Sequence, residues 1–404
     1  MRTLIIGNNV AGTNLAKALR DADANVEVEI FSDEAMPYYP RPRLIDYLAG
    51  TVDELSMPFF PIDWYEKNRI KLNLRAKAEK IDPTGKKVLA NGTWHAYDKL
   101  AIATGSGAFV PPLKGLPKEN AFTLRTIEDA RKIKQRANES EHLIVIGGGL
   151  LGLESARALC QSHPDLRVTV LEYAEHLLMR QLDHQGAQVI QKWLEDLGTK
   201  VVVKAEGEEI LGGSKVIGVK LKDGRVMEGD LVLISAGTRP NLALARDAGL
   251  KVNKGLIVDG SLRTSNPDIF ALGDVVEFEG RVWGIIPPAL DEAKVAAKKM
   301  LGQPTPDYMG TVPSNTLKIM GLDLSSIGTV RSEHEPPEPS FEEIRAGTPD
   351  GKVYKKFVIR DGKMIGAILL GTKKDANKVA KMIKDGTPVG NIKSGLSDPD
   401  FAFP

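Results

Sequence analysis

Residues 142–172 read HLIVIGGGLLGLESARALCQSHPDLRVTVLE and predict one complete β-α-β unit. The apolar run 143–146 indicates a short buried strand. The sequence after the glycines is rich in alanine and leucine and predicts a helix that ends near Gln161, and the apolar run 168–171 predicts a second strand. A strand, a glycine-rich turn, a helix and a strand in this order are typical of dinucleotide-binding α/β domains.

Three glycines follow the first of these strands with the spacing G-x-G-x-x-G. Gly147 permits the tight turn, Gly149 lets a pyrophosphate approach the backbone, and Gly152 lets helix and strand pack closely. The helix N-terminus, which includes Leu151, offers N–H groups to phosphates, and Glu172 can hold a ribose 2′-hydroxyl. A chance glycine-rich turn is the alternative, but both strands, the helix and the acid stand at the expected distances, so we expect nucleotide binding.

Length and composition favour a soluble protein of two or three domains. The chain has 404 residues, and its 54 Lys and Arg nearly balance its 53 Asp and Glu, for a net charge of +1. This balance argues against extensive nucleic-acid binding but is compatible with a local basic patch. The single cysteine, Cys160, excludes an internal disulfide and a cysteine-ligated metal site. No membrane-spanning run and no signal-peptide pattern occur, which predicts a cytoplasmic protein.

The N-terminus carries a second version of the same unit. A strand is expected over residues 3–6, a turn over 7–12, a helix over 13–20 and a second strand over 26–31. In the turn, Gly7 keeps the first glycine position, but Asn9 replaces the middle glycine. Asparagine tolerates positive φ better than most residues, yet its Cβ crowds the approach of a pyrophosphate.

The rest of this N-terminal motif is also only partly regular. Ala11 and Gly12 complete the turn, and the ribose position falls on Ser32, with Asp33 and Glu34 after it as acids that could take the same role. A structural Rossmann-like start that binds nothing is the alternative. Two such units in one chain favour binding at both, because enzymes that combine a flavin with a nicotinamide need one site for each dinucleotide.

Two basic segments follow the first unit. Arg41 and Arg43 lie in a proline-rich loop, residues 36–43, and suit a diphosphate or a flavin edge, with a basic surface loop as the alternative. Residues 66–80 carry six basic side chains and few apolar ones, which is usually a solvated face.

Several later stretches predict strand ends at which ligands bind. A strand over 98–103 runs into Thr104 and Gly105, and a strand over 231–235 runs into Gly237. These two stretches predict the exits from the two nucleotide domains.

A third buried strand is expected to deliver Gly273 and Asp274 at its carboxyl end, where α/β sheets bind ligands. Asp274 could accept a hydrogen bond from a polyol hydroxyl. Pro288 and Ala289 then open a helix whose N-terminus could stabilise an anion; an ordinary capped helix is the alternative.

The remaining elements are simpler. Helices are expected over 127–137 and 182–197, and a small antiparallel set is expected over 201–204, 216–221 and 226–228. After residue 304 the composition changes, and a hairpin over 353–370 and a helix over 375–384 predict a small α+β domain.

Taken together, these motifs resemble the pyridine nucleotide-disulfide oxidoreductase superfamily over almost the whole chain. The resemblance implies an α/β fold with two Rossmann-like domains, similar to glutathione reductase, and a small α+β C-terminal domain. It implies an FAD-binding domain over 1–110 and 238–305, an NAD-binding domain over 111–237 and the third domain over 306–404. The first glycine unit would bind FAD, the second would bind NAD(P)H, and Asp274 would hold the FAD ribityl chain. The positions expected to contact FAD in the first domain also include Ala78 and Ala103.

The branch of the superfamily follows from the cysteines. Disulfide reductases of this group need redox cysteines near the flavin, and this chain has none there. Cys160 lies late in the nucleotide helix, where a small buried residue is expected. The chain therefore resembles the cysteine-free branch, which includes rubredoxin reductases, ferredoxin reductases and the flavin portion of nitrite reductases. The resemblance places Thr316 near the flavin and pairs Glu154 with a basic residue beside it, for which we expect Arg43.

The sequence thus predicts a flavoprotein that passes electrons from NADH through FAD to a small carrier, most simply a rubredoxin. Alternatives are an NADH oxidase, a reductase for a ferredoxin or nitrite reductase partner, and a nucleotide-sensing flavoprotein without rapid turnover. The oligomeric state is left open. The basic stretches at Arg41 and Arg43, at 67–80 and at Lys355 and Lys356 are the expected steering charges for an acidic carrier.

Overall fold

A computed structural model describes residues 1–319, 321–330, 340–348 and 351–403, with the backbone alone described for residues 314–319. The chain forms two compact units. The first comprises residues 1–47, 51–108 and 238–311, and the second comprises residues 48–50, 109–237 and 312–404. The expected partition into three domains stays a prediction.

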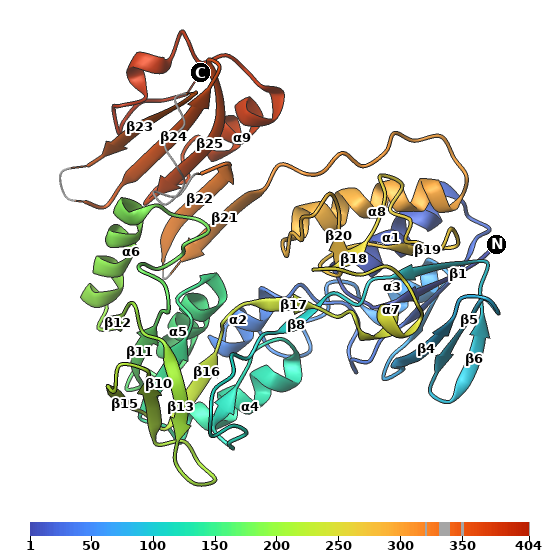
Figure 1. Ribbon diagram of the computed structural model, residues 1–404, viewed down its shortest axis with the longest axis horizontal. Coiled ribbons are helices and arrows are strands. Elements are labelled where there is room, and N and C mark those ends of the chain that lie inside the picture. Colours follow the sequence, from blue (N-terminus) through green and yellow to red (C-terminus); the bar gives the residue numbers. More distant parts are fainter. Residues whose placement is uncertain (320, 331–339, 349–350, 404) are drawn as a thin grey trace. The chain divides into compact units, whose positions relative to one another are not determined.

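A five-stranded parallel sheet forms the centre of the first unit, with the strand order β19-β7-β1-β2-β3 (Figure 1). These strands are β1 (Arg2–Ile6), β2 (Glu27–Phe31), β3 (Ile70–Asn73), β7 (Lys99–Ile102) and β19 (Ile269–Ala271). The register pairs Ile6 with Phe31 on one side and with Ile102 on the other. Three strands therefore end level with one another, which creates one edge at which a ligand can meet all of them.

Short sheets and helices surround this parallel sheet. The smaller sheets are β4 (Ala78–Asp82), β5 (Lys87–Ala90) and β6 (Thr93–Ala96) in one, β8 (Ser106–Ala108) with β17 (Thr238–Pro240), and β18 (Leu256–Ile257) with β20 (Val276–Glu277). The helices are α1 (Val10–Ala22), α2 (Arg43–Leu48, whose last residue belongs to the second unit), α3 (Ile62–Lys67), α7 (Ala243–Asp247) and α8 (Ile286–Met300). The helices α1 and α8 pack against each other (Figure 1).

The second unit contains a second parallel sheet with the order β12-β11-β10-β16-β9. Its strands are β9 (Ala121–Phe122), β10 (His142–Ile146), β11 (Arg167–Leu171), β12 (Lys200–Val202) and β16 (Leu231–Ile234), and its helices are α4 (Ile127–Ala137), α5 (Leu150–Ser162) and α6 (His184–Asp196). A three-stranded antiparallel sheet holds β13 (Gly207–Leu211), β14 (Gly218–Leu221) and β15 (Val226–Glu228). The assignment of residues 201–204 to this antiparallel set was wrong, because β12 pairs in parallel with β11.

The same unit ends in an antiparallel sheet with the order β21-β22-β25-β24-β23 (Figure 1). Its strands are β21 (Ser314–Ile319), β22 (Leu322–Gly328), β23 (Phe341–Gly347), β24 (Tyr354–Arg360) and β25 (Lys363–Leu370), and α9 (Ala376–Asp385) and a short 3₁₀ helix (Lys393–Gly395) follow. Apolar side chains of β24 and β25 pack with those of α9, for example Phe357, Ala367 and Val379.

The expectation that Lys355 and Lys356 form a steering surface was wrong. Only 4% of Lys355 and none of Lys356 is exposed. Successive residues of a strand point to opposite faces, so the two lysines are covered on both sides of the sheet. On one side, the Lys356 ammonium lies 3.4 Å from an oxygen of Asp183 and 3.2 Å from one of Glu343.

The architecture confirms the predicted α/β class with two Rossmann-like sheets and a small antiparallel C-terminal sheet. Several helices start where the sequence provides a cap. Thr126 and Asp129 form a reciprocal capping box at α4, and Asp183 caps α6 through the N–H of Gly186. Within the described ranges, no helix combines the length and the apolar character needed to cross a bilayer.

Candidate functional site

The first glycine of each motif adopts a backbone conformation that other residues avoid. Gly7 has φ +115° and Gly147 has φ +116°. A Cβ on Gly7 would lie 2.1 Å from the carbonyl oxygen of Ala103, and one on Gly147 would lie 2.3 Å from that of Ser235. Both turns are therefore closed against the neighbouring strand, and only glycine fits at either position.

The third glycine of each motif is required for close helix packing. A Cβ on Gly12 would lie 1.9 Å from the carbonyl oxygen of Gly7, and one on Gly152 would lie 2.2 Å from that of Gly147. These distances are far below a normal contact, so the helix starts α1 and α5 can lie against their turns only because both residues are glycine.

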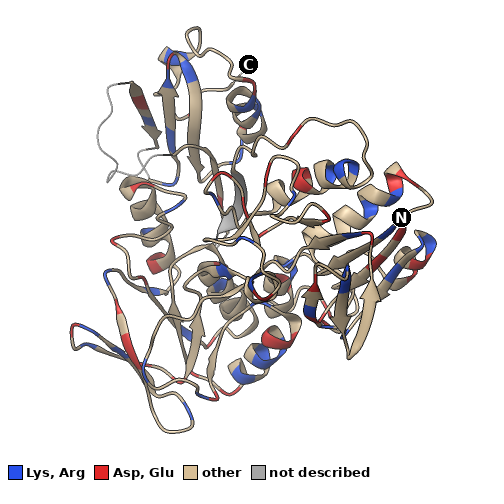
Figure 2. Ribbon diagram, turned by 45° about the vertical axis from the view of Figure 1, so that its right-hand side comes forward, with Lys and Arg blue, Asp and Glu red and all other residues tan. Residues whose placement is uncertain are grey.

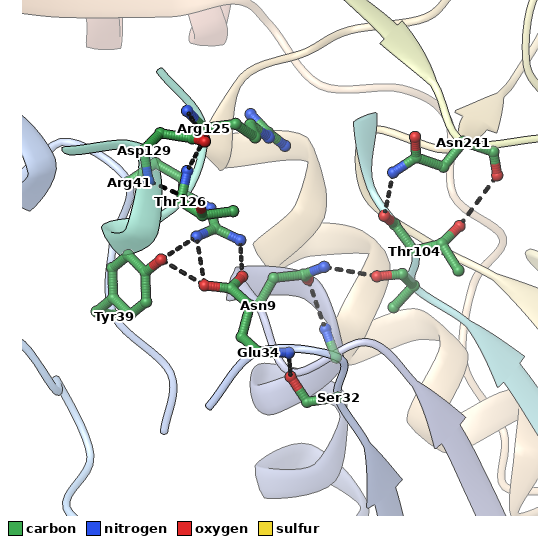
Figure 3. Close-up of polar contacts among 12 residues, drawn as sticks. Asn9, Ser32, Glu34, Tyr39, Arg41, Thr104, Arg125, Thr126, Asp129 and Asn241 are labelled. Carbon is green, nitrogen blue, oxygen red and sulfur yellow. Dashed lines mark hydrogen bonds and ion pairs between the residues drawn. The ribbon is translucent and has the colours of Figure 1, made fainter. Parts of the chain in front are cut away.

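The two turns differ at the position of the middle glycine of the motif. At Gly149, the N-cap of α5, an added Cβ would meet nothing within 4 Å, and no side chain caps the helix. At Asn9, the N-cap of α1, the side-chain oxygen accepts hydrogen bonds from the N–H groups of Ala11 (3.0 Å) and Gly12 (3.3 Å). The side-chain nitrogen donates to the carbonyl oxygen of Ala103 at 2.5 Å (Figure 3). The space before α5 is thus open, whereas the start of α1 is covered by an amide.

The acid of the second motif lies against its own glycine turn. The N–H of Gly148 donates to Oε2 of Glu172 at 2.6 Å, and the N–H of Ala174 donates to Oε1 at 2.7 Å. Both oxygens are held at the end of β11, and a carboxylate can accept further hydrogen bonds beyond these two. Glu172 is therefore fixed where the sequence predicted a ribose acceptor; the ribose contact itself stays a prediction.

The acids of the first motif differ in their availability. Oε2 of Glu34 accepts from Nη1 of Arg41 at 3.1 Å and from the Tyr39 hydroxyl, Nη2 of Arg41 donates to Oε1, and Nη1 also donates to the Tyr39 oxygen at 2.6 Å (Figure 3). Burial alone would lower the pKa of Arg41, but its bonds and charge interactions with Glu34 and Tyr39 raise it. Asp33 is exposed and Ser32 is buried, so Asp33 is the accessible acid at this strand end.

A cavity of about 860 Å³ opens at the carboxyl ends of β1 and β2. Its volume is in the range of small-molecule and cofactor sites. The predicted contact residues that line it are Gly7, Asn9, Ser32, Asp33, Arg41, Ala78 and Thr104. Those that do not line it are Ala11, Gly12, Arg43, Ala103, Gly105, Gly273, Asp274, Pro288 and Ala289. The assignment of individual side chains to a bound cofactor stays a prediction.

Asn8 was missed by the sequence prediction and also lines this cavity. Its side-chain oxygen accepts from the hydroxyls of Thr13 (2.9 Å) and Tyr65 (3.0 Å). Its side-chain nitrogen is buried and has no hydrogen-bond acceptor among the residues that the structure describes. An unsatisfied buried donor in a glycine turn fits a site whose ligand carries phosphate oxygens. This observation supports the presence of a dinucleotide in the cavity.

The chain segments that follow the two predicted nucleotide-binding motifs pair in one two-stranded sheet. The strands β8 and β17 pair in antiparallel fashion just after Gly105 and Gly237. The Asn241 side chain donates to the carbonyl oxygen of Thr104 at 2.8 Å, and the Thr104 hydroxyl donates to the carbonyl oxygen of Asn241 at 3.2 Å (Figure 3). Asn241 was not predicted, and its only sequence signal was its place in the repeated strand-and-glycine pattern.

Gly273 and Asp274 lie at the end of β19, beside α8. The Ser106 hydroxyl donates to Oδ2 of Asp274 at 2.8 Å. The N–H of Gly273 donates to Oε2 of Glu292 at 2.6 Å, and only 1% of Glu292 is exposed. Burial raises the pKa of Glu292 to about 7; the bond from Gly273 opposes this shift, and the charges of Asp274 and Asp291 add to it. Glu292 is a second carboxyl group at this site that the sequence prediction missed.

The start of α8 has no side-chain cap, and the binding of an anion there stays a prediction. Pro287 and Pro288 occupy the second and third helical positions, after the N-cap Ile285, whose side chain makes no capping hydrogen bond, and Ile286; Ala289 is fully buried. Proline is favoured at these positions because its missing N–H has no partner in the first turn in any case.

The structure does not test the predicted pairing of Arg43 with Glu154 at the flavin edge. Nη1 of Arg43 donates to the carbonyl oxygen of Met57 at 3.1 Å and to that of Ser56. Glu154 lies on α5 in the other unit, and the pairing of the two stays a prediction. Thr316 is in β21, and its side chain lies outside the described residues.

Cys160 is the only cysteine of the chain. It lies in the last turns of α5, its sulfur is 4.0 Å from the carbonyl oxygen of Leu166, and burial raises the pKa of its thiol. A raised pKa disfavours the thiolate, which is the reactive form. Among the described residues, no group of His, Cys, Asp and Glu side chains could hold a metal ion.

Comparisons with known proteins agree with this geometry. Residues 1–299 match the family model described as pyridine nucleotide-disulphide oxidoreductase, and residues 313–387 match the rubredoxin NAD+ reductase C-terminal domain. The chain is 31% identical to the NADH-rubredoxin oxidoreductase of Clostridium acetobutylicum over 97% of both chains. The crystal structure of NADH:rubredoxin oxidoreductase from Clostridium acetobutylicum superimposes with a TM-score of 0.79 at 28% identity, over 97% of both chains.

Other relatives are longer than this chain. It is 35% identical to the nitrite reductase [NAD(P)H] of Bacillus subtilis over 94% of its own length but 47% of the relative's. The chain spans about half the length of this protein and of other nitrite- and nitrate-reductase relatives that it matches. The family matches confirm the expected cofactors, FAD and NADH.

Proposed function

Because the chain belongs to the pyridine nucleotide-disulphide oxidoreductase family, we propose that this NAD(P)H oxidoreductase passes electrons from NADH through FAD to a small carrier protein of the rubredoxin type. One observation carries the proposal: the chain has two glycine turns, each at the edge of its own parallel sheet and one of them with Asn9 in place of the middle glycine, but only one cysteine, late in α5. The chain thus has one glycine turn for each of two dinucleotides, but it lacks the pair of cysteines that a dithiol acceptor needs.

The residues of the chain bind and orient the reactants. When bound, FAD takes up a hydride from NADH and releases electrons one at a time. The turn at Gly147 and Gly149, whose N-cap residue offers no side-chain cap, would hold the coenzyme diphosphate, and Glu172 would hold its ribose. The cavity that contains Asn8 would hold part of FAD, and Asp274 would accept a hydrogen bond from the ribityl chain.

The carrier is proposed from the C-terminal match and from a full-length relative. Residues 313–387 resemble a domain found in rubredoxin reductases, and the Clostridium relative aligns over nearly all of both chains. Basic and acidic residues are interspersed along the ribbons of both units (Figure 2), and Lys67 and Lys71 are paired with Asp63 and Glu29. Steering of an acidic carrier would therefore depend on exposed cations of the first unit such as Lys77 and Lys80 rather than on Lys355 and Lys356.

Anaerobic turnover tests the proposal. NADH oxidation is followed with the FAD-loaded protein in the presence of an acidic rubredoxin, and rubredoxin reduction is recorded at the same time. We expect sustained turnover with two rubredoxins reduced for each NADH. NADH oxidation that requires oxygen would support an oxidase instead. Flavin reduction by NADH without turnover on any carrier would support a nucleotide sensor.

A second candidate is a reductase that serves a nitrite-reducing partner. It is favoured by the 35% identity to about half of the Bacillus subtilis nitrite reductase, since a homologous electron-donating portion could act on a separate protein. The same anaerobic assay with a nitrite-reducing partner protein from the native extract and nitrite as the final acceptor separates it from the first candidate: ammonium formation that depends on NADH would favour it.

A further inference from the structure

We propose that the side-chain amide of Asn9 competes with the diphosphate of FAD for the N–H groups at the start of α1, so that FAD binds by displacing this amide and Asn9 limits the affinity for FAD. This inference rests on the binding of FAD by the first glycine unit and does not depend on which protein accepts the electrons.

The amide occupies the groups that a diphosphate would use. The first N–H groups of a helix have no partner within the helix and attract anions. In α1, the N–H groups of Ala11 and Gly12 donate to the side-chain oxygen of Asn9 at 3.0 and 3.3 Å. The amide nitrogen is anchored on the carbonyl oxygen of Ala103 at 2.5 Å. Three hydrogen bonds therefore hold the side chain over the helix start.

The second glycine turn of the same chain is the internal reference. Gly149 occupies the position in α5 that Asn9 occupies in α1, and no side chain caps α5. A Cβ added to Gly149 would have no other heavy atom within 4 Å, apart from those of its chain neighbours. The first glycines of the two turns share their φ angle within one degree, and both N-cap residues are extended, with φ −124° at Asn9 and −81° at Gly149. The two turns therefore have a similar backbone, and the amide that covers the start of α1 comes from the side chain of Asn9.

The competition is unequal but not negligible. A diphosphate carries negative charge, which the positive end of the helix dipole favours over a neutral amide. FAD therefore still binds. An asparagine cap stabilises a helix relative to alanine by an amount that corresponds to roughly three- to thirtyfold in an equilibrium constant, and this factor is lost from the affinity for FAD.

The test uses apoprotein prepared from the full chain, with the dissociation constant of FAD measured by flavin fluorescence. Asn9→Gly and Asn9→Ala both remove the amide. We expect Asn9→Ala to lower the dissociation constant about three- to thirtyfold, and Asn9→Gly to lower it as well, by a smaller factor because glycine is itself a good N-cap residue. Unchanged or weaker binding in Asn9→Ala would overturn the proposal. If only Asn9→Gly binds more tightly, the Cβ and not the amide is the obstacle, and the proposal also fails.

Matched controls separate this effect from folding and from function. Gly149→Asn introduces the amide at the equivalent position of α5 and should weaken NADH binding by a similar factor while leaving the FAD constant unchanged. ADP, a probe that carries a diphosphate, should show the same gain as FAD in both Asn9 variants, whereas adenosine should show none. A gain for adenosine equal to that for ADP would contradict the proposed competition. Far-UV circular dichroism of each apoprotein checks that the fold is retained.

These readouts do not involve an electron acceptor. A failure of rubredoxin reduction therefore overturns the proposed function and leaves the Asn9 result standing. A first unit that binds neither FAD nor ADP in the unmodified chain would overturn both.

Discussion

Replacement of Glu172 by alanine should abolish the preference for NADH over NADPH. The carboxylate is fixed by two backbone hydrogen bonds, 2.6 Å from the nitrogen of Gly148 and 2.7 Å from that of Ala174, and its remaining lone pairs can accept from a ribose hydroxyl. A hydrogen bond to a charged group contributes about 1.5–3 kcal/mol, which corresponds to roughly ten- to a hundredfold in kcat/KM for NADH. NADPH should gain, since its 2′-phosphate would no longer face a carboxylate.

The assay is rapid mixing of the FAD-loaded protein with either coenzyme without oxygen, followed by the loss of the visible flavin absorbance. Glu175→Ala is the matched control, because Glu175 lies three residues further on, is half-exposed and pairs with Lys204 at 3.0 Å on the surface. We expect this control to keep the ratio of NADH to NADPH reduction rates of the unmodified protein.

Two results would refute the reasoning. The first is a Glu172→Ala variant that keeps its preference for NADH, which would show that the carboxylate does not contact the ribose. The second is an equal loss in Glu172→Ala and Glu175→Ala, which would show a general charge effect in place of a specific contact.

Three further predictions concern buried groups. Lys356→Met should lower the free energy of unfolding in urea, because the buried carboxylate of Asp183 loses the ammonium 3.4 Å away; the loss should stay below the about 3–5 kcal/mol of a fully unpaired buried charge, since Arg345 at 3.6 Å and the hydrogen bonds from Tyr354 and Gly186 remain. Lys355→Met, at a buried lysine with no ion pair among the described residues, should change it by less than about 1 kcal/mol. Equal effects would contradict this. Burial raises the pKa of Glu292 to about 7 from 4.5, so the folded state keeps a proton that the unfolded state loses, and this group lowers stability as pH rises from about 4.5 to about 7. At pH 8, Glu292→Gln should therefore have a free energy of unfolding up to about 3 kcal/mol higher than the unmodified protein, and near pH 4 the two should be equal. A difference that does not change with pH would contradict the titration. Cys160→Ser should keep FAD and most of the electron-transfer rate, and a loss of transfer with FAD still bound would revive a thiol mechanism.

Features that depend on neighbouring residues could be predicted from the sequence. The helix over 127–137 was placed with its true ends because Thr126 and Asp129 cap it locally. The two glycine turns were located because a φ near +115° and a close neighbouring carbonyl admit only glycine at their first position. Such signals are written within a few residues and do not require knowledge of what packs against them.

Features that depend on distant segments could not be predicted. The strand β12 resembles its antiparallel neighbours in composition, and only its pairing with β11 places it in the parallel sheet. Lys356 is buried between two counter-charges, and one of them, Asp183, lies more than 170 residues earlier in the chain. Glu292 reads as an ordinary helix acid until Gly273 is placed against it. The sequence carries the partners in each case but not their proximity.

Reductive titration of the FAD-loaded protein with NADH under argon, followed by addition of oxidised rubredoxin, tests the central claim most directly. With one cysteine in the chain, FAD is the only two-electron store expected, so one NADH per chain should complete the absorbance change. The stored electrons should then reduce two rubredoxins. An uptake of two NADH per chain would reveal a second redox group, and rubredoxin that stays oxidised would contradict the proposed transfer.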